Sequence, residues 1–285
     1  MNENQGVSLA FGEVLFDRFK GQDVLGGAPL NFAWHLRQFG HRTAMVSAVG
    51  KDQLGAEART FLTQADIDQS QVADRPEATG TVDVSLEGGE PTYVIHENVA
   101  WDHIELRDAA LEQPDLVYFG TLAQRTEGNR ETLRKLLATA PRHRLCDINL
   151  RVPFHSDSVV LDSLHQATIV KLNDAEWPIV QQLTRLPTPI QLLDRFDLEM
   201  VAMTRGEAGA VLYFKDEIRS ASASSVPVVD TVGAGDAFCA ALAAGTLADA
   251  DPVTILAVAC DAGAAIVQQR GGQGQLPDAV TRAYS

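Results

Sequence analysis

The sequence predicts an α/β protein whose central sheet is mostly parallel and is covered by helices on both faces. Short apolar runs alternate with helix-like segments along most of the chain, which is the pattern of such a sheet. Several of these runs are continuously apolar, as expected for strands that are buried on both faces. The chain has 285 residues, of which 45% are hydrophobic, close to the upper limit of about 250–300 residues for one continuous core. We therefore expect a single domain, residues 1–285.

The individual elements follow from local signals. The apolar run 7–11 predicts the first strand, and Gly12-Glu13 ends it. Pro29 suits the first turn of a helix and Gly40 suits its end, so residues 30–39 are predicted to be helical. The remaining predicted strands are 43–49, 116–119, 144–148, 168–172, 198–203 and 226–229, and the remaining predicted helices are 53–65, 126–138, 158–166, 175–183, 190–196, 237–248 and 252–269.

One stretch departs from the alternation of strand and helix. Residues 79–84 and 91–96 alternate apolar and polar positions, and Glu87-Gly88-Gly89-Glu90 lies between them. This pattern predicts a β-hairpin with a half-buried face and a glycine turn. Such a hairpin is either a surface decoration or a lid that excludes water from a substrate.

The composition excludes several classes of function. The chain carries 23 Lys and Arg against 38 Asp and Glu, a net charge of −15, which argues against binding to nucleic acid or anionic membranes. Cys146, Cys239 and Cys260 are far apart without a CxxC spacing, so we expect buried free thiols. No apolar run approaches the roughly 18 residues that span a bilayer. The first residues lack the pattern of a signal peptide, and we expect a cytoplasmic protein.

The most informative stretch is Asp230-Thr231-Val232-Gly233-Ala234-Gly235-Asp236-Ala237-Phe238, between a predicted strand and a predicted helix. The first N–H groups of a helix have no partner within it, and the helix dipole adds partial positive charge there. Gly233, Ala234 and Gly235 can therefore hold an anion. Asp236 beside such a hole is suited to take a proton from a hydroxyl during phosphoryl transfer. The alternative is a helix-capping acid after a glycine turn.

Further polar residues follow the ends of other predicted strands. Asp17 could accept hydrogen bonds from two sugar hydroxyls, and Asn31 could donate and accept at once. Each could also be an ordinary solvated residue. Because ligands of open α/β sheets bind outside the carboxyl ends of the strands, we expect the residues that follow these strands to meet at one edge. They are Asn149, Arg151, Asn173, Glu176, Thr204, Arg205, Gly206 and the segment 230–236.

Two of these stretches resemble the signatures of the ribokinase-like (PfkB) sugar kinases. DTVGAGDAF resembles the C-terminal signature, and GGAPLNFAWHLRQFGHRTAMVSAVGKDQLG resembles the N-terminal one. The Ala-Pro after the glycine pair, the segment DINLR with its following proline, and residues 120–125 are most similar to fructokinases. The resemblance covers nearly the whole chain. It implies a ribokinase-like three-layer α/β/α sandwich, with a small β lid from about 12–25 and 79–101.

The resemblance also implies a function. It is ATP-dependent phosphorylation of a sugar primary hydroxyl, with fructose as the first expectation. Asp236 would be the base, and Gly233, Ala234 and Gly235 would form the anion hole. The implied sugar-binding residues are Asp17, Gly27, Asn31, Tyr93, Arg125, Arg151 and Asp236. The implied nucleotide-binding residues are Lys171, Asn173, Thr204, Gly206, Gly235, Cys260 and Gly263.

Two metal sites are implied in the same way. Asn173 and Glu176 match the pair that organises Mg²⁺ through water in this family. A monovalent cation such as K⁺ is often held beside the anion hole, and the matching positions are Asp230, Val232, Ile266, Gln269, Gly271 and Gln275. ATP and Mg²⁺ are thus the expected cosubstrate and metal, with K⁺ as an additional ion.

Other functions stay open. A ribokinase, a 2-keto-3-deoxygluconate kinase or a nucleoside kinase could carry the same residues. A non-catalytic sugar sensor would be expected to lack Asp236 or a glycine of the hole. A dinucleotide-dependent oxidoreductase needs GxGxxG after the first strand, where this chain has Gly12-Glu13. The loop between Asp17 and Gly26 is shorter than in many fructokinases, which weakens any inference about dimerisation through the lid. The protein is expected to be either a monomer or a homodimer.

Overall fold

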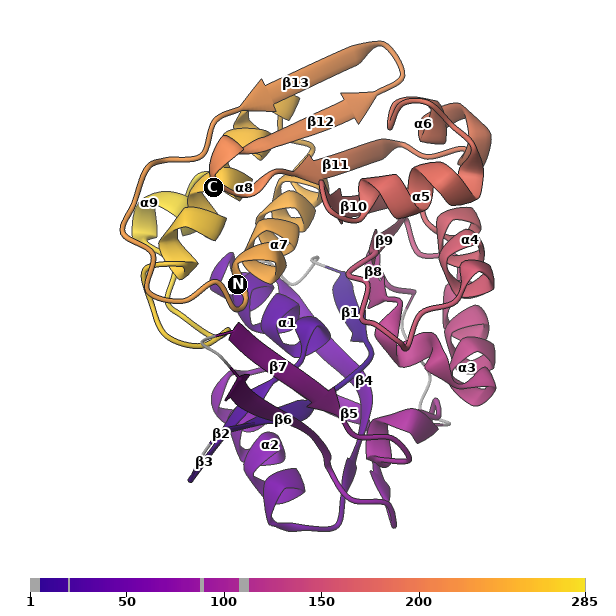
Figure 1. Cartoon of the computed structure of the whole chain (residues 1–285), viewed down its shortest axis with the longest axis vertical. Helices are drawn as coiled ribbons and strands as arrows, with labels where there is room; N and C mark the ends of the chain where they lie inside the picture. Colours follow the sequence, from indigo (N-terminus) through magenta and orange to yellow (C-terminus); the bar gives the residue numbers. More distant parts are fainter. Residues whose placement is uncertain (1–5, 20, 88–89, 108–112, 285) are drawn as a thin grey trace.

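A large sheet with helices on both faces forms the centre of the computed structural model, which describes residues 6–19, 21–87, 90–107 and 113–284 (Figure 1). Its nine strands lie in the order β13-β12-β11-β10-β9-β8-β1-β4-β5. Neighbouring strands are parallel except at β12, which is antiparallel to both of its neighbours. The strands are β1 (Val7–Phe11), β4 (Arg42–Gly50), β5 (Asp68–Arg75), β8 (Leu116–Gly120), β9 (His143–Asp147), β10 (Ile169–Asn173), β11 (Met200–Thr204), β12 (Ala210–Phe214) and β13 (Glu217–Ala221).

Helices cover the sheet in two layers, as the sandwich prediction required (Figure 1). One layer shares a buried core with the sheet and contains α1 (Ala28–Gln38), α2 (Gln53–Gln64), α7 (Ala234–Leu247) and α8 (Pro252–Ile266). The other layer packs on a second core and contains α3 (Glu127–Leu137), α4 (Asp157–Gln166), α5 (Trp177–Thr184) and α6 (Gln191–Phe196). A short helix, α9 (Asp278–Thr281), follows α8. Within the described ranges, no helix is long and apolar enough to cross a membrane.

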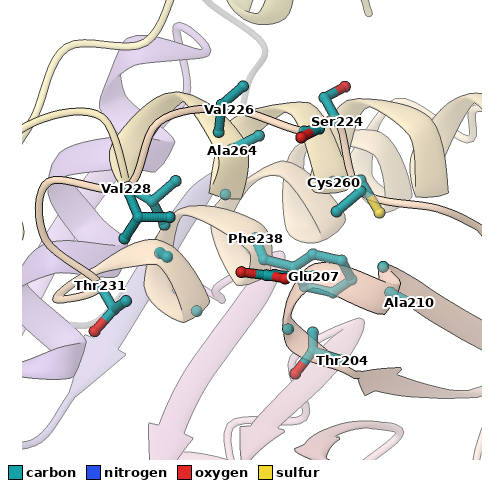
Figure 2. Close-up of a pocket in the computed structure, with 18 residues that line it drawn as sticks. Thr204, Glu207, Ala210, Ser224, Val226, Val228, Thr231, Phe238, Cys260 and Ala264 are labelled. Atoms are coloured by element: carbon teal, nitrogen blue, oxygen red, sulfur yellow. The ribbon is translucent and has the colours of Figure 1, made fainter.

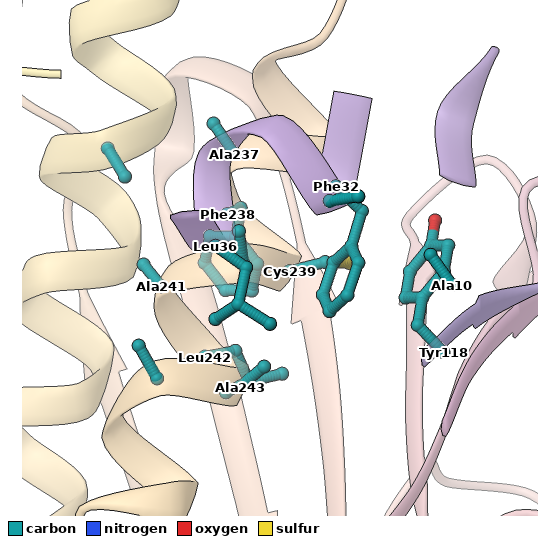
Figure 3. Close-up of a cluster of buried hydrophobic side chains, with 14 of the residues drawn as sticks. Ala10, Phe32, Leu36, Tyr118, Ala237, Phe238, Cys239, Ala241, Leu242 and Ala243 are labelled. Carbon is teal, nitrogen blue, oxygen red and sulfur yellow. The ribbon is translucent and has the colours of Figure 1, made fainter. Parts of the chain in front are cut away.

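Helix α7 lies between α1 and α8, and its residues from Asp236 to Gly245 are all buried. Figure 3 shows part of this packing, in which alanines of α7 face Leu36 and Phe32 of α1. The ring of Phe32 stacks on Tyr118 of β8 with a centroid distance of 4.0 Å. Small side chains let neighbouring helices approach closely, so the start of α7 is held from several sides.

A second, smaller sheet has the strand order β3-β2-β6-β7 and contains the segments that the resemblance assigns to a lid. Its strands are β2 (Leu15–Phe19), β3 (Gln22–Gly26), β6 (Gly80–Glu87) and β7 (Glu90–Ile95). Trp101 is buried at its base, in a cluster with Leu15 and Val82, so it supports this sheet as a core residue. The predicted Gly88-Gly89 turn lies outside the described residues.

The prediction of a strand over 226–229 is wrong. Pro227 has no N–H to donate to a sheet, and the N–H of Val229 donates instead to the carbonyl of Val267, just after α8. Strands β5, β12 and β13 were not predicted from the sequence. The hairpin of β12 and β13 extends the parallel sheet at its edge. The three cysteines are free and buried, as expected.

Candidate active site

The first turn of α7 carries Asp236, and Gly233 immediately precedes the helix. Gly233 has a left-handed backbone (φ 80°), and a Cβ there would lie 2.5 Å from the Cα of Gly272, so only glycine fits. The N–H groups of this first turn are free of helical partners. Asp236 is only 7% exposed. Burial raises its pKa to about 6, against the opposing effect of a hydrogen bond from Asn31. A buried carboxylate of this pKa can accept a proton close to neutral pH.

Asn31 of α1 connects this acid to the C-terminal glycine loop. Its Nδ2 donates to Oδ2 of Asp236 over 2.8 Å, and its Oδ1 accepts from Nε2 of Gln273 over 2.6 Å. One turn further along α1, Nε2 of His35 donates to the carbonyl of Gly272 over 2.8 Å. Burial lowers the pKa of His35 to about 4, so the ring stays neutral. The segment at Gly272 and Gln273 is therefore bound to the face of α1 that carries Asn31.

Three further predicted sugar-binding residues are Asp17, Gly27 and Arg151. Asp17 lies half-buried on β2. Burial raises its pKa to about 6, while Arg151 lowers it and Asp230 raises it. Gly27 has φ +111°, and a Cβ there would lie 2.4 Å from the carbonyl oxygen of Glu13. Arg151 is exposed, and its charge lowers the pKa of both Asp17 and Asp236. Both acids thus lie within electrostatic reach of one arginine.

Glu13 is a buried acid of this site that the sequence did not reveal as functional. It is 6% exposed, and its carboxylate accepts hydrogen bonds from its own backbone N–H and from that of Ala28, at the start of α1. Burial raises its pKa to about 7; Arg151 lowers that pKa and Asp236 raises it. The only signal in the sequence was a glutamate directly after the first strand.

Arg125 lies elsewhere, at the base of the lid. Its Nε and Nη2 donate to the two carboxylate oxygens of Asp102 over 2.7 and 2.8 Å, and its guanidinium lies 3.9 Å from the ring centre of Trp101. It lines a cavity of about 460 Å³. The described residues that line this cavity do not include Asp17, Asn31 or Asp236. Tyr93 on β7 is 55% exposed. The structure therefore does not bring Arg125 together with the acids around Asp236.

A larger cavity, of about 610 Å³, is lined by Ala234, Gly235 and Phe238 of α7 (Figure 2). Its walls are mostly apolar or small and include Val226, Val228, Phe238 and Ala264. Apolar walls with a few polar groups are typical of small-molecule sites. The predicted nucleotide-binding residues that line it are Thr204, Gly206, Gly235, Cys260 and Gly263. Lys171 and Asn173 are not among its lining residues, and Lys171 lies buried behind Gly235.

Known proteins that are similar in sequence and fold identify the family of the chain. A family model described as "pfkB family carbohydrate kinase" matches residues 4–279. The chain belongs to this family. A fructokinase of Salmonella typhimurium is 29% identical to this pfkB-family kinase over 277 residues, which cover 88% of each chain. A putative sugar kinase of Pyrococcus horikoshii is 28% identical over 270 residues, covering 87% of this chain and 84% of the relative.

A solved structure of similar shape is the fructokinase of Vibrio cholerae O395 in its fructose, ADP and calcium ion bound form. It superimposes with a TM-score of 0.83 at 25% identity, covering 98% of this chain and 99% of that one. The pfkB-family kinase is thus an ATP-dependent carbohydrate kinase with a ribokinase-like fold.

In the kinase, the side chains of Asn173 and Glu176 each accept a hydrogen bond from the backbone N–H of the other residue. The N–H of Asn173 donates to Oε2 of Glu176 over 2.8 Å, and the N–H of Glu176 donates to Oδ1 of Asn173 over 2.9 Å. The other oxygen of Glu176 accepts from the N–H of Leu150 over 2.8 Å. Burial, and the nearby charge of Asp147, raise the pKa of Glu176. The pair is therefore fixed at the junction of β10 and α5.

The six positions expected around a monovalent cation are brought together. Asp230 accepts from the N–H of Val232 and, over 2.9 Å, from that of Gly271. The N–H of Gln269 donates to Ile266, and its side chain exchanges hydrogen bonds with the backbone of Gln275. Among the described residues, no group of three or more His, Cys, Asp or Glu side chains could hold a metal. A cation here would be bound mainly by carbonyl oxygens, which suit K⁺.

Proposed function

We propose that the kinase transfers the terminal phosphoryl group of ATP to the primary hydroxyl of fructose, giving fructose 6-phosphate. One observation carries this proposal. Asp236 is a buried carboxylate at the start of α7, and it is bound by Asn31 from the N-terminal motif. Gly235, its neighbour, lines the apolar cavity suited to a nucleotide. A hydroxyl beside Asp236 would therefore face the end of a nucleotide in that cavity.

The proposed reaction follows from this placement. Asp17 and Asn31 would hold sugar hydroxyls, and Arg151 would add positive charge at the same edge. The sugar oxygen attacks the terminal phosphorus, and its proton passes to a carboxylate oxygen of Asp236. The new O–P bond forms as the bond between phosphorus and the bridging oxygen of ATP breaks, which releases ADP. Because phosphoryl transfer has a loose transition state, the proton can leave late, and a carboxylate is a sufficient base.

The start of α7 would stabilise the charge on the transferring group. The backbone N–H groups of Gly233, Ala234 and Gly235 would donate to that group, and the helix dipole would add to their effect. Mg²⁺, when bound with ATP, would neutralise charge on its phosphate oxygens. We propose that Asn173 and Glu176 orient that ion through water. Backbone hydrogen bonds to Oδ1 of Asn173 and Oε2 of Glu176 hold both side chains in a fixed position for this role. The cluster around Asp230 and Gly271 would hold K⁺.

The choice of fructose is supported by two similar fructokinases, from Salmonella typhimurium and Vibrio cholerae. A direct test measures ADP release with fructose, ribose, 2-keto-3-deoxygluconate and adenosine. We expect the highest kcat/KM with fructose. If another acceptor gives a higher kcat/KM, that acceptor and not fructose is the substrate. If no acceptor gives ADP release, the proposal is contradicted.

The role of Asp236 is tested with Asp236→Asn, which should bind ATP but lose turnover by several orders of magnitude. Asp251→Asn is a matched control, because Asp251 is also an acid at a helix start, where it only caps α8. The control should keep the wild-type kcat. Near-native turnover in Asp236→Asn would show that Asp236 is a capping acid and not a base.

A further inference from the structure

The N-terminal motif GGAPLNFAWHLRQFGHRTAMVSAVGKDQLG ends in a segment to which the proposed function gives no role, residues 49–55. This segment runs from the carboxyl end of β4 into α2. Asp52 caps that helix, because its Oδ1 accepts from the N–H of Gly55 over 2.8 Å. Capping alone would be an ordinary use of an aspartate at a helix start. Asp52, however, also binds a residue outside its own helix.

That residue is Thr79, which directly precedes strand β6 of the small sheet. Its N–H donates to Oδ2 of Asp52 over 2.8 Å, and its hydroxyl donates to Oδ1 over 2.6 Å. The same hydroxyl accepts from the N–H of Gly50, at the end of β4, over 3.0 Å. Thr79 is buried, whereas Asp52 is exposed. Burial opposes the charge of Asp52, but the hydrogen bonds from Thr79 and Gly55 outweigh it and lower the pKa.

Three glycines leave the space that this junction needs. A Cβ on Gly50 would lie 2.6 Å from Oδ2 of Asp52, and a Cβ on Gly55 would lie 2.1 Å from the carbonyl oxygen of Gly50. A Cβ on Gly80, the first residue of β6, would lie 2.2 Å from Nε1 of the buried Trp101. None of the three has a left-handed backbone, so close approach is the reason for glycine at these positions. This packing fixes the point at which β6 begins.

Strand β6 carries the constraint to the proposed sugar site. It pairs in parallel with β2, with Gly80 opposite Leu15 and Val82 opposite Asp17. A slip of one residue between paired strands would turn the side chains to the other face. A Cβ on Gly26 would lie 3.1 Å from Oδ2 of Asp17, so that carboxylate lies against the glycine pair before α1. The start of β6 therefore bears on where the carboxylate of Asp17 lies.

We propose that Asp52 and Thr79 form an anchor that holds the small sheet against the carboxyl end of β4 and positions Asp17 for the sugar. This rests on the function proposed above. Both are positioning residues, because they act through Asp17 and not on the reacting atoms. The described residues that line the larger cavity, proposed for the nucleotide, include none of this junction. The anchor should therefore affect the binding of the sugar and not that of ATP.

Steady-state kinetics of Asp52→Asn and Thr79→Val test the anchor. We expect the KM for fructose to rise about 10-fold in each, the effect of losing one hydrogen bond to a charged group. The KM for ATP should stay unchanged. The double variant should be no worse than the worse single variant, because both substitutions break the same contact. Thr79→Ser keeps the hydroxyl and should keep the wild-type KM.

Asp251→Asn is the matched control, because Asp251 caps α8 through hydrogen bonds within its own helix. It should leave the KM for fructose unchanged. A wild-type KM for fructose in Asp52→Asn would overturn the proposal. An equal rise in the KM values for fructose and ATP would also overturn it, because that result indicates a general loss of structure.

Hydrogen exchange gives a second readout that does not depend on the acceptor. In Asp52→Asn, the backbone amides of β6 and β2 should exchange about 10-fold faster than in wild type. In Asp251→Asn they should keep the wild-type rates. Unchanged protection of β6 and β2 in Asp52→Asn would overturn the proposal. Failure of the proposed function looks different, since wild type would then release no ADP with fructose while the exchange result would still stand.

Discussion

The side-chain amide of Asn31 donates a hydrogen bond of 2.8 Å to the carboxylate of Asp236, which lies 205 residues further along the chain. Gln273 fixes the orientation of that amide, because it donates to the carbonyl oxygen of Asn31 over 2.6 Å. With the amide reversed, two oxygen atoms would face each other. The proton affinity of Asp236 is thus set by three separate parts of the chain, namely α1, the start of α7 and the C-terminal glycine loop.

The first prediction concerns the acid limb of activity. Asp236 must be ionised to accept a proton, and its pKa is raised to about 6. The value of kcat/KM should therefore fall as the pH drops through about 6, where an ordinary aspartate would still be ionised. The bond from Asn31 favours the ionised form, so Asn31→Ala should move the acid limb to higher pH.

A pH profile of kcat/KM with fructose measures this shift. Asp17 has a similar pKa, but Asn31 is not among the groups that shift it, so the substitution separates the two acids. Gln38→Ala is the control, since Gln38 lies on the same helix and binds only the backbone around Gly274 and the ring of His35. An acid limb that stays in place in Asn31→Ala would exclude Asp236 as the titrating base.

The second prediction concerns stability and Glu13. Its folded-state pKa of about 7 lies above the ordinary 4.5, so the folded protein binds this proton more tightly than the unfolded chain. This contribution is complete below about pH 4 and is lost as the pH rises through 7. At pH 8 the buried charge costs at most about 3 kcal/mol, taking 1.36 kcal/mol per pKa unit.

Glu13→Gln removes that charge while keeping an oxygen for the N–H of Ala28. Denaturant unfolding should therefore show the variant gaining stability relative to wild type as the pH rises from about 5 to 8. A difference between the two proteins that does not change with pH would mean that Glu13 keeps an ordinary pKa in the fold.

The third prediction separates the two glycines of the proposed anion hole. Gly233→Ala should destabilise the protein, because it forces a side chain into a left-handed backbone and against Gly272. Gly235→Ala needs no strained backbone and presses only on Lys171. Its main effect should be on kcat. Thermal unfolding and steady-state kinetics of both variants test this, and a larger loss of Tm in Gly235→Ala would contradict it.

The fourth prediction concerns the base of the lid. Asp102→Ala leaves the buried guanidinium of Arg125 without its partner, which typically costs about 3–5 kcal/mol. Asp83→Ala is the control, because the pair of Asp83 with His96 is nearly half exposed and contributes about 0–1 kcal/mol. Denaturant unfolding of the two variants should separate them clearly. Equal stabilities would show that Arg125 is not held by Asp102 in solution.

Much of the fold was accessible from the sequence because strands of this sheet are short, apolar and separated by helices with clear ends. Pro29 and Gly40, for instance, correctly bracketed α1. The failure at 226–229 has a local cause, since an apolar run with β-branched residues also suits an extended segment that pairs with the end of a helix. Strand β13, at the edge, has mostly exposed side chains and therefore no buried pattern to detect.

The site was predictable only where a motif keeps its residues close together. Asp236 and its three preceding residues belong to one turn, so their relation could be inferred from order alone. Glu13 and Gln273 are placed by partners that only tertiary contact supplies, and no spacing indicates them. Gly235 was interpreted as part of an anion hole, whereas its missing side chain also makes room for Lys171. Such partners come from neighbouring strands and loops.

Helix α7 is buried along most of its length, and most of its buried side chains are alanines. Adding even one methylene group to such a packed region typically costs about 1–3 kcal/mol. The proposed base, Asp236, thus lies on a closely packed helix in which larger side chains would be costly. Adaptation to a new acceptor would have to come from the exposed loop around Arg151 and the small sheet, which leave the chemistry in place while the specificity evolves.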